Sequence, residues 1–162
     1  MAGDRKAGGR RGRDAGVTLV ELLVAIAVLL VLAGAIVPSV QFAVKRQREL
    51  ELRHALRSMR HAIDEYKKFC DAGAIAKEGV DSECYPTKLE VLVEGVDRVG
   101  VVGQKLKFLR RIPFDPFTKK QEWGMRSYQD DWDSTSWGQE NVYDVYSVVS
   151  GKALDGTDYK DW

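Results

Sequence analysis

The most apolar part of the chain is residues 17–40, VTLVELLVAIAVLLVLAGAIVPSV, in which Glu21 is the only ionisable residue. A helix of about 20 apolar residues crosses the hydrocarbon core of a bilayer. A cleaved secretory signal has a shorter apolar core that is followed by a small-residue site. The pattern therefore predicts a transmembrane helix that the mature chain retains, with an acidic side chain near its N-terminal end.

A second hydrophobic pattern follows at residues 41–72, where apolar residues recur at steps of three and four. Its members are Leu52, Ala55, Leu56, Met59, Ala62, Ile63, Tyr66 and Phe69 or Cys70. Charged side chains occupy the positions between them, so one face of a helix is apolar. Neither glycine nor proline occurs between residues 40 and 72. We therefore expect one very long helix that continues from the membrane segment and ends at about Gly73.

Residues 73–162 have shorter patterns that are typical of a small mixed domain. Thr87 and Glu90 have the spacing of a capping box, which predicts a short helix over residues 87–93. Two segments rich in β-branched and aromatic residues, 123–128 and 142–149, are strand candidates. The sequence therefore predicts an α+β fold, in which the distal half of the long helix packs on a small antiparallel sheet.

The net charge is +1, but the charges are segregated along the chain. The first 16 residues are basic, whereas the C-terminal region is acidic and aromatic. The positive-inside rule keeps the basic segment in the cytoplasm, which places the C-terminal part outside. A basic cluster at Lys45, Arg46 and Arg48 fits a solvated collar where the helix leaves the membrane. The alternative is that this cluster binds anionic lipid or nucleic acid.

Two cysteines, Cys70 and Cys84, lie in the part of the chain that we expect on the oxidising side of the membrane. A disulfide between them would close a loop of about 15 residues and contribute on the order of 3 kcal/mol. The alternative is two unbonded thiols, one of them buried. Because the compartment is expected to be oxidising and the two cysteines are suitably spaced, we expect the disulfide.

No set of residues in the sequence predicts a catalytic centre. His54 and His61 lie on one helix face without an evident third metal ligand. Ser147 has neither a histidine partner nor a Gly-x-Ser-x-Gly context. We therefore expect a protein that is not an enzyme.

The segment GVTLVE at residues 16–21 resembles the processing site of type IV prepilins and type II secretion pseudopilins. In those families a prepilin peptidase cuts after the glycine and methylates the new N-terminus. The resemblance implies cleavage after Gly16 and methylation of Val17, where phenylalanine is usual. It gives filament-assembly roles to Glu21, the fifth residue of the mature chain, and to Pro38, the twenty-second. The expected parts are a cleaved basic leader (1–16), a transmembrane assembly helix (17–40), the distal half of the helix (41–72) and a periplasmic head domain (73–162).

Further segments of the chain resemble the major pseudopilin of type II secretion. They comprise Tyr85-Pro86-Thr87, the segment IPFDP at 112–116, the strand at 144–147 and the tail at 155–162. The resemblance implies a pilin-like fold and a single-pass inner-membrane subunit that polymerises with itself into a periplasmic pseudopilus. Its implied partners are the prepilin peptidase, the inner-membrane platform of the secretion system and the minor pseudopilins. Nucleic acid is not an expected partner.

Three alternatives stay open at this point. A type IV pilin would form a surface pilus for adhesion, motility or DNA uptake. A competence pseudopilin would bind DNA through its head domain, against which the acidic C-terminal region argues. A signal-anchored periplasmic enzyme would need a convergent catalytic set, which the sequence does not contain.

Glu21 has a physical rationale within this resemblance. An acidic side chain at mid-bilayer costs about 2.5–3.5 kcal/mol on translocon scales, and such residues usually have a partner. Cleavage after Gly16 creates an ammonium group at Val17, with which Glu21 of a neighbouring subunit can pair when the helices bundle. The alternative is a carboxylate that is merely tolerated near the membrane surface.

Many members of the resembled family bind calcium in a C-terminal loop. Here the loop is shorter and Ser150-Gly151 replaces an Asp-Gly, although Asp144, Asp155 and Asp158 are candidate oxygen ligands. Calcium takes about 6–8 oxygens, so the loss of an aspartate argues against the site. We therefore expect that the protein requires no cofactor and that turns and the packing of Trp162 hold the tail in place. The alternative is that a bound calcium ion holds it.

Overall fold

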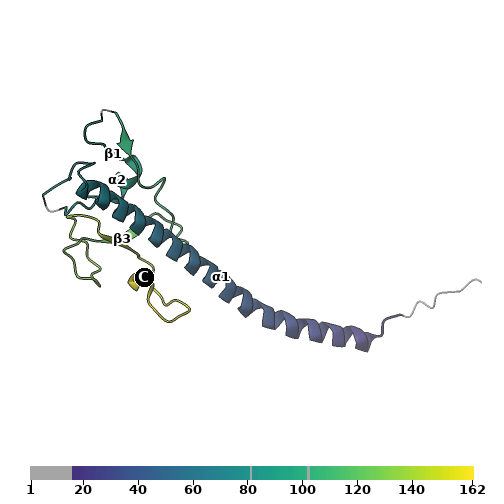
Figure 1. Ribbon diagram of the computed structural model, residues 1–162. Coiled ribbons are helices and arrows are strands. Elements are labelled where there is room, and N and C mark those ends of the chain that lie inside the picture. The colour runs from purple at the N-terminus through teal and green to yellow at the C-terminus, as the bar shows by residue number, and fades with distance from the viewer. Residues whose placement is uncertain (1–15, 81, 102) are drawn as a thin grey trace, which may run out of the picture. The chain divides into compact units, whose positions relative to one another are not determined.

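The computed structural model of the protein describes residues 16–80, 82–101 and 103–162, without the side chains of residues 35–39. The leader predicted for residues 1–16 therefore lies, except for Gly16, outside the described residues. The elements are α1 (Leu19–Asp71), α2 (Leu89–Glu94), β1 (Val96–Asp97), β2 (Lys105–Leu106), β3 (Trp123–Arg126), β4 (Asp144–Ser147) and the 3-10 helix η1 (Tyr159–Asp161). Figure 1 shows the ribbon, with α1, α2, β1 and β3 labelled. The chain forms two compact units, of which the first ends at Phe42 and the second is Ala43–Trp162.

The distal part of α1 supplies the centre of the second unit's core. Its buried apolar side chains are Leu52, Ala55, Leu56, Met59, Ala62, Ile63, Tyr66 and Cys70, and none is more than 8 % exposed. The predicted long amphipathic helix is thus confirmed. The helix ends where expected, because Gly73 takes the left-handed conformation at φ 69° and donates its N–H to the carbonyl of Cys70.

The strands form two separate antiparallel ribbons instead of one sheet. β3 pairs with β4, with Trp123 opposite Ser147 and Arg126 opposite Asp144, and β1 pairs with β2. β4 is shorter than the predicted segment 142–149, and before its first residue the N–H of Val142 donates to the carbonyl of Pro86 instead of to β3. The α+β class is confirmed, with its extended structure divided between two short pairs.

The short helix α2 begins later than the capping-box spacing predicts, and that prediction is wrong in detail. The hydroxyl of Thr87 donates to Glu78 Oε2 at 3.2 Å. The N-cap position is instead Lys88, whose side chain makes no capping hydrogen bond. The Thr87 side chain is thus directed to a carboxylate of a neighbouring loop and does not lie at the N-cap position of α2.

The turn at residues 112–120 is fixed to β4 by a buried carboxylate. Asp115 Oδ1 accepts the N–H groups of Phe117 at 2.7 Å and Thr118 at 3.3 Å. Its Oδ2 accepts the hydroxyl of Ser147 at 2.6 Å, and both Asp115 and Ser147 are fully buried. Because charged acceptors make strong hydrogen bonds, this side chain holds the proline-containing segment against the β3–β4 pair.

A disulfide joins Cys70, in the last turn of α1, to Cys84, and their Cα atoms lie 5.5 Å apart. It closes the loop that leads from α1 towards α2. The loop therefore has a covalent attachment to the helix on which the second unit is built.

Candidate processing and assembly site

Gly16, Val17 and Thr18 form a non-helical, exposed segment directly before α1. The hydroxyl oxygen of Thr18 accepts the N–H of Glu21 at 3.2 Å, and its carbonyl accepts the N–H of Leu22 at 3.1 Å. Thr18 is therefore the N-cap of α1, and Glu21 lies three residues later in the first turn. The bond between Gly16 and Val17 is thus presented just outside a capped helix end. Sequence reasoning missed this cap, although Thr18 and Glu21 have the same spacing as Thr87 and Glu90.

The glycine at position 16 is not required by the fold of the chain. A Cβ atom added there would meet no other atom within 4 Å, and the residue does not need the left-handed conformation. The same open space surrounds Gly34 within α1. A requirement for glycine at position 16 would therefore come from a protein that binds this segment.

The first part of α1 and the residue Val17 before it present an apolar surface that is exposed among the described residues. Val17 is 69 % exposed, and the side chains of α1 between 45 and 75 % exposed include Leu19, Val20, Leu22, Leu23, Val24, Ile26, Val28, Leu29, Leu30, Val31 and Leu32. Surfaces of this kind mark contact with lipid or with other proteins. Within the part of the chain whose side chains are described, no helix has an apolar stretch long enough to cross a membrane. The predicted span, residues 17–40, contains residues 35–39, whose side chains are not described. Pro38 is one of these residues.

Each of the three aspartates considered as calcium ligands interacts with another part of its own chain. Asp144 binds Arg60, with Nε to Oδ1 at 2.6 Å, and it also lies 3.5 Å from Arg126. Asp158 precedes η1 and pairs through its backbone with Lys152. Among the described residues no three His, Cys, Asp or Glu side chains are grouped as metal ligands. The structure therefore does not bring the predicted set together as a metal site.

Asp155 is likewise occupied by groups of its own chain. Its carboxylate accepts the hydroxyl of Thr157 at 2.6 Å and the backbone N–H of Thr157 at 3.0 Å, and it binds Arg53 at 2.7 Å. These interactions lower the pKa of Asp155, the Thr157 hydrogen bonds more than the arginine. A calcium ion at this carboxylate would have to displace a guanidinium group.

The tail, residues 151–162, is attached to α1 by side chains that follow one face of the helix. Lys45 Nζ donates to the carbonyl of Lys152 at 2.7 Å. Glu49 Oε1 accepts the N–H of Leu154 at 2.9 Å and the hydroxyl of Tyr159 at 3.0 Å. Lys45 and Glu49 are four residues apart, as is Arg53, so consecutive turns of the helix hold the tail.

Further along α1, aromatic and main-chain contacts complete this attachment. The guanidinium of Arg53 lies 4.0 Å from the ring centroid of Trp162, and Arg60 donates to the carbonyl of Trp162 at 2.7 Å. The expected packing of Trp162 is present, but the charged residues on α1 were not anticipated. The available signal was Glu49, an acidic residue three positions before Leu52 on the apolar face.

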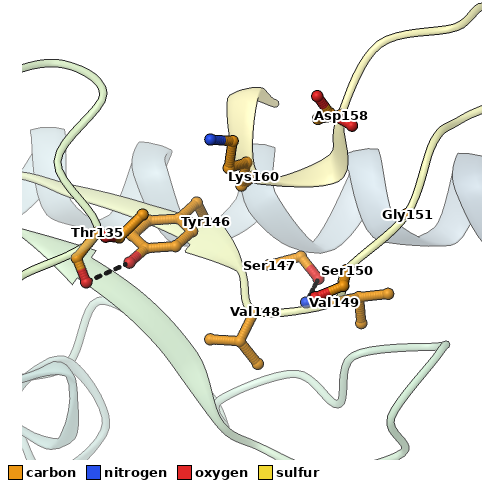
Figure 2. A pocket seen from close by; sticks show the side chains of 9 residues that line it. All are labelled: Thr135, Tyr146, Ser147, Val148, Val149, Ser150, Gly151, Asp158 and Lys160. Carbon is orange, nitrogen blue, oxygen red and sulfur yellow. Dashed lines mark hydrogen bonds between the residues drawn. The ribbon is translucent and has the colours of Figure 1, made fainter.

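A hollow of about 410 Å³ lies between β4 and the tail, and Figure 2 shows its lining. The hydroxyl of Tyr146 donates to the carbonyl of Thr135 at 3.2 Å. The hydroxyl oxygen of Ser147 accepts the N–H of Val149 at 3.2 Å. The main polar side chains on the β4 side are thus used to hold the fold, and we assign this hollow no ligand.

In comparisons with protein families, residues 11–37 match the prokaryotic N-terminal methylation motif. The match includes Gly16, Val17 and Glu21, and the motif is a prepilin signal of the type IV pilin-like kind. No match to this chain was found among the curated proteins or among the solved structures. The chain thus carries a prepilin-type signal, which indicates a membrane-anchored N-terminal segment and a structural subunit.

Proposed function

We propose that this chain is a pseudopilin, cleaved by a prepilin peptidase after Gly16, methylated at Val17 and polymerised into a periplasmic filament for type II protein secretion. The observation that carries the proposal is the position of the prepilin-type motif. Its scissile bond lies in an exposed, non-helical segment, two residues before the first residue of a capped helix. A peptidase can reach such a bond without unwinding α1.

Filament assembly follows from the apolar surface of the first unit. Side chains such as Leu19 and Val31 are 75 and 74 % exposed. Packing of the helices of several copies would remove this apolar surface from water, which is favourable. The amine that cleavage creates at Val17 is positive, and Glu21 is negative. Pairing Glu21 of one copy with the Val17 amine of the next would neutralise both charges inside the bundle and set the axial register. Pro38 belongs to the same proposed assembly helix.

The second unit, which holds the head domain, is proposed to lie on the periplasmic side, with the leader in the cytoplasm. Its disulfide, Cys70–Cys84, suits an oxidising compartment. The proposed partners are the prepilin peptidase, the inner-membrane platform, the minor pseudopilins and further copies of the chain. The work of such a subunit is mechanical, so we propose no catalytic role for it.

A surface pilus of the type IV kind is the alternative assembly. Two features support a pseudopilus: the short tail attached to α1 through Glu49, and the IPFDP turn that Asp115 fixes to β4. Electron microscopy of cells at native expression separates the two assemblies. Filaments that extend beyond the cell surface would favour the pilus.

The processing step is tested with Gly16→Ala in the full-length chain, co-expressed with a prepilin peptidase. We expect an uncleaved precursor on a size gel, because an added Cβ disturbs only a protein bound at the site. Gly34→Ala is the matched control, since its Cβ also meets open space, and it should be cleaved normally. Normal cleavage of Gly16→Ala would refute the proposed processing.

The assembly step is tested with Glu21→Ala in cells that also supply the assembly machinery. We expect the variant to be inserted and cleaved but to yield few ordered filaments. Glu51→Ala removes an exposed carboxylate from the second unit and serves as the control. Wild-type filament yield and order in Glu21→Ala would contradict the pairing of Glu21 with the Val17 amine.

A further inference from the structure

A basic groove runs along α1 in the second unit. It consists of two adjoining hollows of about 400 and 510 Å³, whose linings share Leu50 and Arg53. Arg46 lines the first hollow together with the acidic residues Glu49 and Asp155. Arg57 and Arg60 line the second hollow, whose lining, among the described residues, contains no acidic residue. The spacing of these residues places them along one side of the helix. Leu50 is 54 % exposed, so the groove also offers apolar surface between its charges.

Part of the positive charge in the groove is not neutralised by the chain itself. Arg53 pairs with Asp155, and Arg60 pairs with Asp144. Within the described residues, Arg46 and Arg57 take part in no salt bridge. The groove therefore keeps two guanidinium groups without a carboxylate at salt-bridge distance among the described residues, one in each hollow, and the Nε of Arg57 donates to the carbonyl of Arg53 at 3.2 Å.

The complementary surface is the loop after β3. Trp132 is 81 % exposed and is flanked by the exposed residues Asp131 and Asp133. Neither of these aspartates forms a salt bridge with a described residue. Tryptophan is over-represented among the residues that dominate binding energy in protein interfaces. An indole presented to solvent between two carboxylates is therefore a candidate anchor for a basic, partly apolar groove.

The loop is held in shape before any partner binds. Asp130 turns inward, and its Oδ2 accepts the N–H groups of Ser127 at 2.7 Å and Gly138 at 3.1 Å. The N–H of Ser134 donates to the carbonyl of Asp131 at 3.0 Å, which closes a turn around Trp132. A preformed loop loses little conformational entropy on binding.

We propose that the acidic loop 131–133 of one copy docks into the basic groove of the next copy. Its aspartates would pair with Arg46 and Arg57, and Trp132 would pack on Leu50 and a guanidinium face. The groove already shows the second kind of contact, since Arg53 covers the ring of Trp162. Charge complementarity selects a second copy of this chain over an anionic lipid surface, because the loop supplies both the acids and the apolar anchor.

The proposed contact has a consequence for the assembly. Because the loop and the groove are different surfaces, the contact is heterologous and leaves one of each free at the two ends of any oligomer. Repetition of such a contact builds an open helical filament when the rotation does not close. The inference rests on the proposed function and adds to it a contact between the second units of neighbouring copies.

The test uses full-length Trp132→Ala and Arg57→Glu, each expressed with the peptidase and the assembly machinery. Leader cleavage is followed on gels, and filament yield is followed by shearing and electron microscopy. We expect normal cleavage and about a tenfold loss of filament in both variants, the size of a hot-spot truncation. Arg111→Glu makes the same charge change at an exposed site outside the groove and should keep the wild-type yield.

A second measurement locates the contact directly. The double variant Leu50→Cys and Asp133→Cys should give a ladder of disulfide-linked oligomers in oxidised filaments. Pairing Leu50→Cys with Val80→Cys, whose site is 87 % exposed but outside the loop, should give none. Wild-type filament yield in Trp132→Ala, or a loss of filament in Arg111→Glu as large as that in Arg57→Glu, would overturn the proposal. It would also be overturned if binding of the chain to lipid vesicles depends on Arg57 but filament formation does not. Failure of the wild-type chain to be cleaved or to form filaments would instead refute the proposed function.

Discussion

Replacing Glu49 by alanine is expected to release the C-terminal tail from α1. Glu49 is 8 % exposed, and its Oε1 accepts both the N–H of Leu154 and the hydroxyl of Tyr159. Tyr159 is 3 % exposed, so its hydroxyl has little access to water. In Glu49→Ala both donors lose their acceptor at once.

The magnitude follows from what each donor can do next. A buried hydroxyl left without a partner costs about 1–3 kcal/mol. The N–H of Leu154 lies in a residue that is 43 % exposed, so water can replace part of its lost hydrogen bond. Removing a largely buried carboxylate also relieves some desolvation cost, which offsets part of the loss. The net loss in the free energy of unfolding should be about 2–3 kcal/mol.

The assay is thermal unfolding of the full-length chain in detergent, followed by near-UV circular dichroism of its tyrosines and tryptophans. A loss of about 2–3 kcal/mol should lower the Tm by roughly 6–12 °C for a domain of this size. Glu49→Gln keeps an acceptor oxygen without the charge and should fall between the wild type and Glu49→Ala. Glu51→Ala is the control, because Glu51 is exposed and its carboxylate accepts a hydrogen bond from its helix neighbour Gln47.

The outcome that would refute this reasoning is a Tm of Glu49→Ala within experimental error of that of Glu51→Ala. A double-mutant cycle with Tyr159→Phe gives an independent check. If the hydrogen bond between Glu49 and Tyr159 stabilises the tail, the two substitutions should not be additive. Full additivity would show that Glu49 acts through Leu154 alone.

Three further predictions concern the same unit. We expect that millimolar calcium or a chelator leaves the Tm of the chain unchanged, because arginines occupy two of the candidate carboxylates; a calcium-dependent rise would contradict this. Burial, helped by Glu49 at Tyr159, raises the pKa of Tyr66 and of Tyr159 to about 12. The neutral phenols are favoured in the folded state, so the contribution of these two tyrosines to stability should be constant below about pH 10 and be lost between about pH 10 and 12 in pH-dependent melts. The hydroxyl of Tyr66 has no hydrogen-bond partner in the described part of the chain, so Tyr66→Phe should raise stability by up to about 1 kcal/mol, and a clear loss would show that this hydroxyl has a partner.

The fold could be predicted to the extent that it depends on local patterns. The three- and four-residue spacing of residues such as Leu52, Met59 and Ile63 fixes which face of α1 enters the core, and that face is buried. The β-branched and aromatic segments became β3 and β4. Periodicity reports burial directly, because a side chain's position on a helix or strand follows from the geometry of that element.

The attachment of the tail could not be predicted in the same way. Glu49 and its partner Tyr159 are 110 residues apart in sequence, and Arg60 and Trp162 are 102 apart. Nothing local to either residue specifies the other, and the contact exists only after the core has placed α1 beside the tail. The sequence therefore offered calcium at Asp155 only as an alternative suggested by the family resemblance, and it did not indicate that Arg53 would bind this carboxylate.

The two Thr-x-x-Glu segments show how context decides between identical local signals. At Thr87 the hydroxyl donates to Glu78 and the N-cap position is the next residue, Lys88, whereas at Thr18 the hydroxyl oxygen accepts the N–H of Glu21 and caps α1. Glu21 thus lies in the first turn, where a negative charge is favourable beside the positive end of the helix dipole. An amine created at Val17 would add positive charge at that same end. The carboxylate therefore offsets unfavourable charge within a single copy, and the proposed pairing in a filament extends this local role between copies.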